Sequence, residues 1–172
     1  ADMTIDFSEL RQSYIQSDEY KPYRDDILEN QTKMQKALKK GDFAKARTAA
    51  ESILNKDYLN LEAHLICQIC SDSLGDVGRA QFHGWVLDGL LDAILASGDG
   101  LTQATAYHVL TVSEEYAVLD VLGLRSEQQS LEHGDDGSSY DVFRAKDKSS
   151  GEKREIFFDI TPMMAALDKM FD

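Results

Sequence analysis

The feature that most constrains the fold is a short segment that occurs twice. Residues 40–46 recur as residues 74–80, so that Gly41 and Gly75 occupy equivalent positions in the two copies. In both copies aspartate follows the glycine, and a small residue, Ala46 or Ala80, ends the segment. Glycine tolerates the backbone angles of a tight turn, and aspartate caps a following helix. The repetition therefore predicts two antiparallel helical hairpins, each closed by a Gly-Asp turn.

The interval between the two copies, about 34 residues, is the period of the tetratricopeptide repeat. Residues 25–96 resemble two degenerate copies of it, with Ala50 and Gly84 where a bulky residue is typical and Tyr58 in place of the junction proline. The resemblance implies that Phe43 and Val77 pack against their turns and that the small residues let the helices approach closely. The structural repeat positions are Gly41, Asp42, Phe43, Ala46, Gly75, Asp76 and Ala80.

After residue 97 the pattern changes to strands separated by turns. Residues 107–112 are rich in β-branched residues and predict a strand, after which Ser113 is expected to cap a helix that ends at Gly123. Further strands are expected in residues 128–133, 140–146 and 154–160. Thr161 is the expected cap of a closing helix, with Pro162 in its first turn. Four residues of that helix are expected to face inward: Met163, Ala166, Leu167 and Met170.

These elements together predict an α+β fold. Tetratricopeptide-like antiparallel helical hairpins in residues 1–97 are expected to pack on a small antiparallel sheet with a closing helix in residues 98–172. A chain of 172 residues suits one integrated domain with a shared core.

The whole chain also resembles an uncharacterised bacterial family, a domain of unknown function. The resemblance is carried by residues 97–100 with Thr105 and Ala106, by residues 114–116, and by a hairpin from Tyr140 to residues 157–159. The family implies no activity. Because its members are often exported, it implies a periplasmic or secreted location. The start at Ala1 favours the same location, as expected after removal of a signal peptide. The alternative is a cytoplasmic protein in which Ala1 and Asp2 are added residues ahead of Met3.

The charge of the chain restricts its partners. With 18 basic and 31 acidic residues the net charge is −13, which repels phosphate backbones and excludes nucleic acid as a favoured partner. The same charge attracts a basic protein, although acidic residues also simply keep a protein in solution. The longest apolar stretch, residues 85–96, contains Asp88 and Asp92, so membrane insertion is not expected.

The expected partner-binding residues lie on the first helix of each hairpin and at the start of the second region. They are Gln31, Gln35, Lys39, Glu62, Asp72, Asp99, Glu114, Glu115 and Tyr116. No metal or cofactor site is expected, because the four histidines have no metal-ligand spacing. Glu114 and Glu115 are adjacent on a helix and point about 100° apart, so electrostatics at the helix start explains them better than a shared proton.

Three further motifs allow more than one interpretation. Cys67 and Cys70 form a Cys-x-x-Cys pair, but they lie within an apolar helical pattern, which favours buried packing over redox chemistry. The loop at residues 98–100 is either a structural turn or an anion-binding loop. The acidic loop at residues 133–141 lacks the spacing of a calcium loop, which favours a solvated loop over weak cation binding.

Three functions follow from these patterns. A non-catalytic protein-interaction module, a scaffold or adaptor of the bacterial envelope, ranks first. An immunity protein that inhibits a secreted toxin is the alternative, since the chain is small and acidic. An enzyme with an unrecognised site around Asp99, Glu114, Glu115 and Tyr116 ranks last, because these residues do not form a recognisable pairing of nucleophile and base.

Deleting all residues after Ser138 is expected to yield an aggregating protein. Ile156, Phe157 and Phe158 are consecutive apolar residues, so both faces of their strand need cover, one from the closing helix and the other from the helical region or another strand. An isolated hairpin is marginal in water. Size-exclusion chromatography and a thermal melt of the truncated chain measure the effect. A truncated protein that stays monomeric and equally heat-stable would show that the C-terminal segment is an independent appendage.

Overall fold

The computed structural model describes residues 4–171, and the side chains up to residue 170. The fold class is α+β, as the sequence predicts. The chain forms two compact units, one made of Ala1–Pro22 with Leu91–Asp172 and the other of Tyr23–Leu90. Helix α5, Val77–Leu95, belongs to both units. The sequence assigned residues 1–22 to the helical region, whereas they group with the sheet. Ala1, one basis for expecting export, lies outside the described residues.

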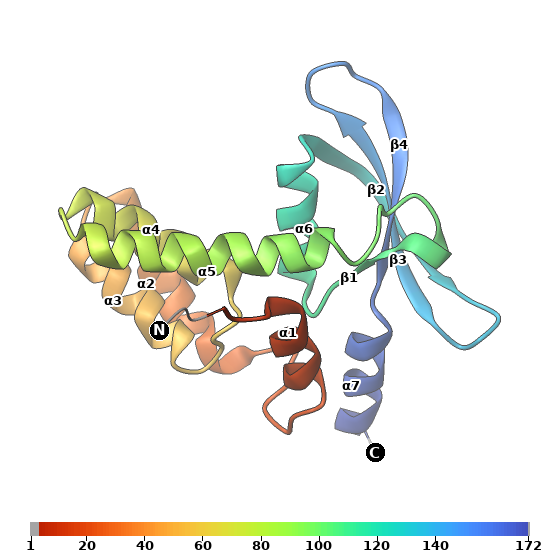
Figure 1. Cartoon of the computed structure of the whole chain (residues 1–172), viewed down its shortest axis with the longest axis horizontal. Helices are drawn as coiled ribbons and strands as arrows, with labels where there is room; N and C mark the ends of the chain where they lie inside the picture. Colours follow the sequence, from red (N-terminus) through yellow and green to blue (C-terminus); the bar gives the residue numbers. More distant parts are fainter. Residues whose placement is uncertain (1–3, 172) are drawn as a thin grey trace. The chain divides into compact units, whose positions relative to one another are not determined.

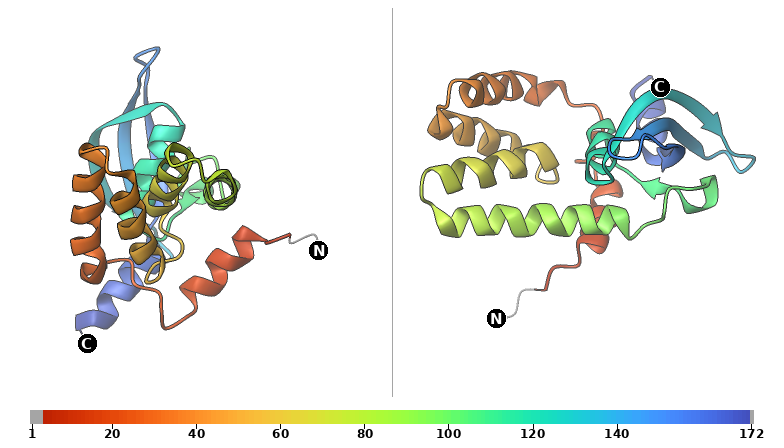
Figure 2. Two further views of the ribbon diagram at one scale, coloured as in Figure 1. Left: turned by 90° about the vertical axis from the view of Figure 1, so that its left-hand side faces the viewer. Right: turned by 90° about the horizontal axis from the view of Figure 1, so that it is seen from above.

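The unit Tyr23–Leu90 consists of helices. A short 3-10 helix, η1, spans Asp25–Ile27 and leads into α2, Leu28–Lys39. Helices α3, Phe43–Leu54, and α4, Leu61–Ser73, follow, and α5 begins at Val77. Figure 2 shows α2, α3, α4 and the first part of α5 side by side in a row.

The repeated segments form the expected turns between these helices. Gly41 and Gly75 have φ angles of 71° and 74°, which a residue with a side chain adopts only at a cost. The carboxylate of Asp42 accepts a hydrogen bond from the backbone N–H of Lys45, and Asp76 caps α5 in the same way. Val77 is 58% exposed, so it does not pack against its turn as its counterpart Phe43 does.

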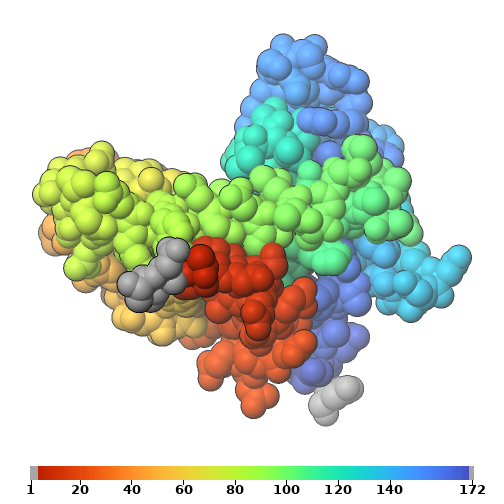
Figure 3. All heavy atoms as spheres, in the orientation of Figure 1, coloured from red at the N-terminus to blue at the C-terminus, as the bar shows by residue number. Residues whose placement is uncertain are grey.

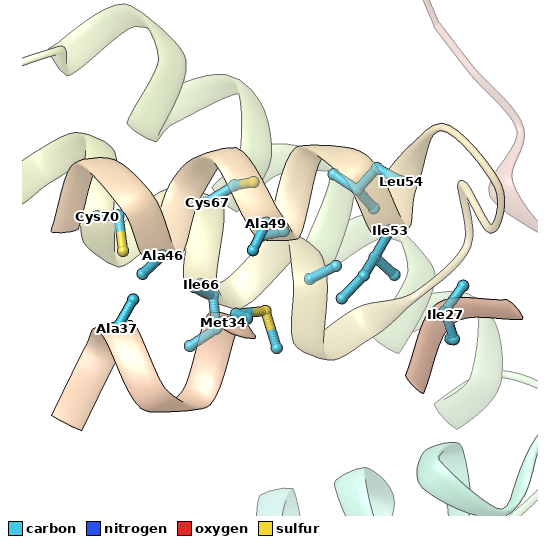
Figure 4. Packing of buried hydrophobic residues seen from close by; sticks show 12 residues of the cluster. Ile27, Met34, Ala37, Ala46, Ala49, Ile53, Leu54, Ile66, Cys67 and Cys70 are labelled. Carbon is cyan, nitrogen blue, oxygen red and sulfur yellow. The ribbon is translucent and has the colours of Figure 1, made fainter. Parts of the chain in front are cut away.

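The core of this unit lies between α2, α3 and α4. Ala46 and Ile53 of α3 are fully buried against Met34 of α2 and against Cys67 and Cys70 of α4 (Figure 4). Both cysteines are free thiols, and burial raises the pKa of Cys67 to about 12. Such a thiol stays protonated at neutral pH, so the packing interpretation of the Cys-x-x-Cys pair is confirmed.

The other unit contains a sheet with strand order β1-β4-β3-β2. Helix α1 spans Phe7–Ile15, η2 Gln103–Thr105, β1 Tyr107–His108 and α6 Val112–Val121. Three longer strands follow: β2 (Leu124–His133), β3 (Ser139–Asp147) and β4 (Lys153–Asp159). The last helix is α7 (Thr161–Phe171). Strand β1 pairs parallel with β4, and the other neighbours are antiparallel. The hairpin turns at residues 134–138 and 148–152 lie at opposite ends of the sheet (Figures 1 and 3).

Both faces of the apolar run in β4 are packed, as the sequence predicts, but not by the expected closing helix and helical region. Beyond this run Arg144 and Glu155 are exposed. On one face Phe143 and Phe158 pack edge to face, with ring centroids 5.5 Å apart, and Tyr116 of α6 packs on Phe143. On the opposite face Phe157 packs on a cluster formed by Val142, Ala106 and Tyr140. Helix α6 and the segment before β1 therefore supply much of this cover, and α7 contacts the sheet at β3.

Several local expectations are wrong. The strand expected in residues 107–112 is only two residues long, because α6 already begins at Val112 and includes Ser113. Thr161 is the first residue of α7, and its hydroxyl accepts a hydrogen bond from the backbone N–H of Ser139 instead of capping. Met170 is 65% exposed and does not face the core, whereas Met163 does.

Replacing Ala46 with leucine should destabilise the protein. Ala46 is fully buried between α3 and its neighbours, and overpacking such a site costs about 1–3 kcal/mol. Ala44→Leu is the matched control, since Ala44 lies on the same helix and is exposed. Urea unfolding of both variants measures the difference. Equal midpoints for Ala46→Leu and the parent would contradict close helix packing at Ala46.

Candidate functional site

Five of the predicted partner-binding residues lie on α2 and α4, the first helices of the two hairpins, and we call this face the α2–α4 surface. Gln35 of α2 donates a hydrogen bond to Glu62 of α4 over 3.4 Å, so these two side chains meet at this surface. On α4 the surface also contains Leu65 and Ile69, which are 41% and 42% exposed. The sequence pattern does not reveal that Leu65 and Ile69 are exposed, because an apolar residue within an amphipathic helix is normally assigned to the core. The remaining expected residues of α2 and α4 are Gln31, Lys39 and Asp72, of which Gln31 is half-buried.

Glu114 does not lie on this surface but in a buried ion pair. Its two carboxylate oxygens accept hydrogen bonds from the guanidinium of Arg11 over 2.5 and 3.0 Å. One of them also accepts the backbone N–H of Leu110, and Arg11 donates to the carbonyl of His108. The arrangement holds α1, β1 and α6 together. Because Arg11 and Leu110 occupy both oxygens, Glu114 offers little surface to a partner.

A small cavity lies beside this ion pair. It has a volume of about 170 Å³, below the ~300–1,000 Å³ typical of small-molecule sites. Its walls come from α1, the end of α5 and β1. The lining residues are Ser8, Arg11, Gln12, Ile15, Ala93, Ala96, Ser97, His108 and Leu110.

Glu115 is fully buried, and neither of its carboxyl oxygens has a hydrogen-bond partner within the described residues. Burial raises its pKa to about 9, and the charge of Asp141 on β3 adds to the shift. Asp141 in turn accepts a hydrogen bond from the amide of Gln129 over 2.8 Å. Glu115 is therefore a neutral acid at pH 7. The two adjacent glutamates have different neighbours, as their angular separation predicts. The protonation state of Glu115, however, is decided by burial and not by electrostatics at the helix start.

Asp99 and Tyr116 complete the predicted set, and the structure gives each a separate local role. The backbone N–H groups of Asp99 and Gly100 both donate to the carbonyl of Thr105, at 3.0 and 2.8 Å. The Asp99 carboxylate accepts the N–H of Leu101. These amides are thus occupied within the loop, which supports the structural-turn interpretation over an anion site. Tyr116 is half-exposed and packs on Phe143.

Two histidines that are distant in sequence meet inside the helical unit. The Nδ1 atoms of His64 and His83 are 3.0 Å apart, and Nε2 of His64 lies 2.8 Å from the carbonyl of Tyr58. Burial lowers the pKa of both rings, that of His64 to about 4. The His64 ring is therefore neutral at pH 7. Nε2 of His64 then donates to Tyr58, which leaves its Nδ1 to accept from His83.

Within residues 4–171, no three His, Cys, Asp or Glu side chains form a group that could hold a metal ion. The acidic loop is ordered by its own backbone, since Asp136 accepts the N–H of Ser138. Nor does any helix in this part of the chain have the length and apolar character required to cross a membrane.

Residues 1–169 match the family described as Domain of unknown function (DUF4919). The chain belongs to this family. The match covers almost the whole sequence and confirms the resemblance to an uncharacterised family. Neither a curated protein nor a solved structure matches the chain.

Replacing Glu115 with glutamine should remove a pH dependence of stability. The folded-state pKa, about 9, lies above the ordinary value of 4.5, so the folded protein holds this proton more tightly than the unfolded chain. The resulting stabilisation is complete below pH 4.5 and is lost as the pH rises toward 9. Because glutamine carries no charge, the melting temperature of Glu115→Gln should exceed that of the parent by a margin that grows over this range.

Two controls separate this effect from other losses of charge. Glu152→Gln changes an exposed residue in a hairpin turn and should leave the pH profile unchanged. Glu114→Gln breaks the buried ion pair and should cost about 3–5 kcal/mol near neutral pH. Parallel melting profiles for Glu115→Gln and the parent from pH 5 to pH 9 would show that Glu115 is not a buried neutral acid.

Proposed function

We propose that this member of the family is a non-catalytic protein-binding module of the bacterial envelope, built on two tetratricopeptide-like repeats. Support for the repeats comes from their matching geometry. Helices α3 and α5 begin at Phe43 and Val77, which are equivalent positions of the two copies, and each follows a glycine with positive φ and a capping aspartate. Helices α2 and α4 are the first members of the two hairpins, which line the binding face in repeats of this kind.

The observation that carries the proposal is the exposed apolar pair Leu65 and Ile69. These side chains lie one helical turn apart on α4, where each is about two-fifths exposed. The polar residues of the same surface include Gln35 and Glu62, which are hydrogen-bonded to each other. Apolar anchors within a polar rim are typical of protein-binding surfaces, where the anchors contribute most of the affinity.

The charge of the surface indicates the kind of segment that binds. Glu62 and Asp72 lie on the same helix as the apolar pair, and the chain as a whole carries a net charge of −13. A partner segment with apolar side chains and lysine or arginine next to them complements both features. Association with such a segment should weaken as the ionic strength rises.

The double variant Leu65→Asp with Ile69→Asp should abolish capture of the partner, because charged side chains replace both anchors. The control pair is Leu101→Asp with Val121→Asp, which changes two apolar residues that are at least as exposed and lie outside the helical unit. Each protein is immobilised and exposed to an extract of the cells that encode it, and bound proteins are compared by mass spectrometry. A protein retained by the parent and the control pair, and lost by the first pair, is the expected result.

Photo-crosslinking tests contact directly. Benzoylphenylalanine at position 69 should crosslink the retained protein, whereas the same group at position 121 should not. A capture profile that is identical for the two variant pairs would overturn the assignment of the α2–α4 surface.

A further inference from the structure

A second surface of the helical unit lies outside the α2–α4 face. It is a groove of about 510 Å³ between α2 and α3, with Ala37 and Ala49 in its wall. Four lysines line it, and the one acidic side chain in its lining, Asp42, pairs with Lys45. The lysines are Lys33, Lys36, Lys40 and Lys45. A chain of net charge −13 thus contains a locally basic groove.

The internal repeat shows what covers the equivalent groove of the second hairpin. A shift by one repeat places Lys33 and Lys36 on Cys67 and Cys70 of α4. Both cysteines are fully buried, and they lie in one cluster with residues of α3, including Ala49 (Figure 4). In the second hairpin, therefore, a helix covers the positions that line the groove in the first.

The charges of that internal contact are also informative. Lys45 is equivalent to Arg79, whose guanidinium pairs with Glu51 of α3. Consider a helix that docks on the first hairpin in the way that α3 docks on the second. An acidic residue of that helix, at the position equivalent to Glu51, would lie next to Lys45. Lys33 pairs with Glu29 and Lys45 with Asp42. Among residues 4–171, Lys36 and Lys40 form no ion pair, so these two lysines carry the uncompensated positive charge of the groove.

We propose that the α2–α3 groove binds an acidic amphipathic helix of a protein partner, stacked on the first hairpin as α3 stacks on the second. Small side chains at Ala37 and Ala49 let the backbone of that helix approach closely. Acidic side chains of the helix meet the lysines at the edges of the groove. The site is distinct from the α2–α4 surface and does not depend on it.

The test uses two stapled helical peptides with the sequence of α3. In one peptide Ala46 and Ala49 are replaced by glutamate. In the intact protein these two residues of α3 lie in one cluster with Cys67 and Cys70, which are equivalent to Lys33 and Lys36 of the groove. In the other, the same positions are lysine. Fluorescence anisotropy measures the affinity of each peptide for the full-length chain. The glutamate peptide should bind at least about tenfold more tightly, which corresponds to ~1.4 kcal/mol.

Charge reversal in the groove separates specific docking from general attraction. Lys36→Glu with Lys40→Glu should remove or invert the preference for the glutamate peptide. The control pair, Lys21→Glu with Lys169→Glu, changes the net charge equally at exposed positions outside the groove and should preserve it. The Leu65→Asp and Ile69→Asp variant should bind the peptide as the parent does, which separates this proposal from the α2–α4 surface.

Three results would overturn the proposal. The first is equal binding of both peptides, and the second is an equal effect of the groove and control pairs. The third is self-association of the parent in sedimentation velocity that the groove pair abolishes, since a second copy would then be the occupant. Circular dichroism of each variant shows that the helical unit remains folded in these comparisons.

Discussion

The unit that contains the sheet depends on one buried ion pair. Arg11 and Glu114 are 103 residues apart in the chain, and three hydrogen bonds from the guanidinium tie α1 to the start of α6 and to β1. Glu114 also fixes the N–H of Leu110. The desolvation penalty of burying two charges is nearly as large as the free energy of their attraction, so the pair contributes a unique geometry more than net stability. Removing either partner, however, would leave an uncompensated buried charge.

Helix α6 shows how position alone separates two identical side chains. Glu114 faces a guanidinium and keeps its charge balanced, whereas Glu115 faces a low-dielectric interior and the carboxylate of Asp141. The second glutamate therefore avoids the cost of desolvation by keeping its proton. Tyr116, the next residue, reaches the aromatic core of the sheet at Phe143. Three consecutive residues of α6 thus contact three different partners: Arg11, Asp141 and Phe143.

The helical unit repeats its geometry without repeating its chemistry. Both Gly-Asp turns have the same backbone conformation, but the residues at equivalent helix positions differ. Where the second hairpin has Cys67 and Cys70 beneath α3, the first has Lys33 and Lys36 beside an open groove. Lysine keeps its ammonium in water while its stem lies along apolar surface, so this end of the row stays solvated. The proposed docking of an acidic helix follows from this difference.

By itself the sequence determined the α+β class, both Gly-Asp turns, the buried cysteines and the need for cover on both sides of the β4 strand. Each rests on local information, namely periodicity, a cap or a residue with unusual backbone freedom. Only the tertiary structure decided the grouping of α1 with the sheet, the Arg11–Glu114 pair, the contact of His64 with His83 and the exposure of Leu65. Each of these depends on which distant segment lies opposite a given side chain. Such long-range pairing produces no periodic pattern in a single sequence, because one favourable contact constrains only the two residues that form it.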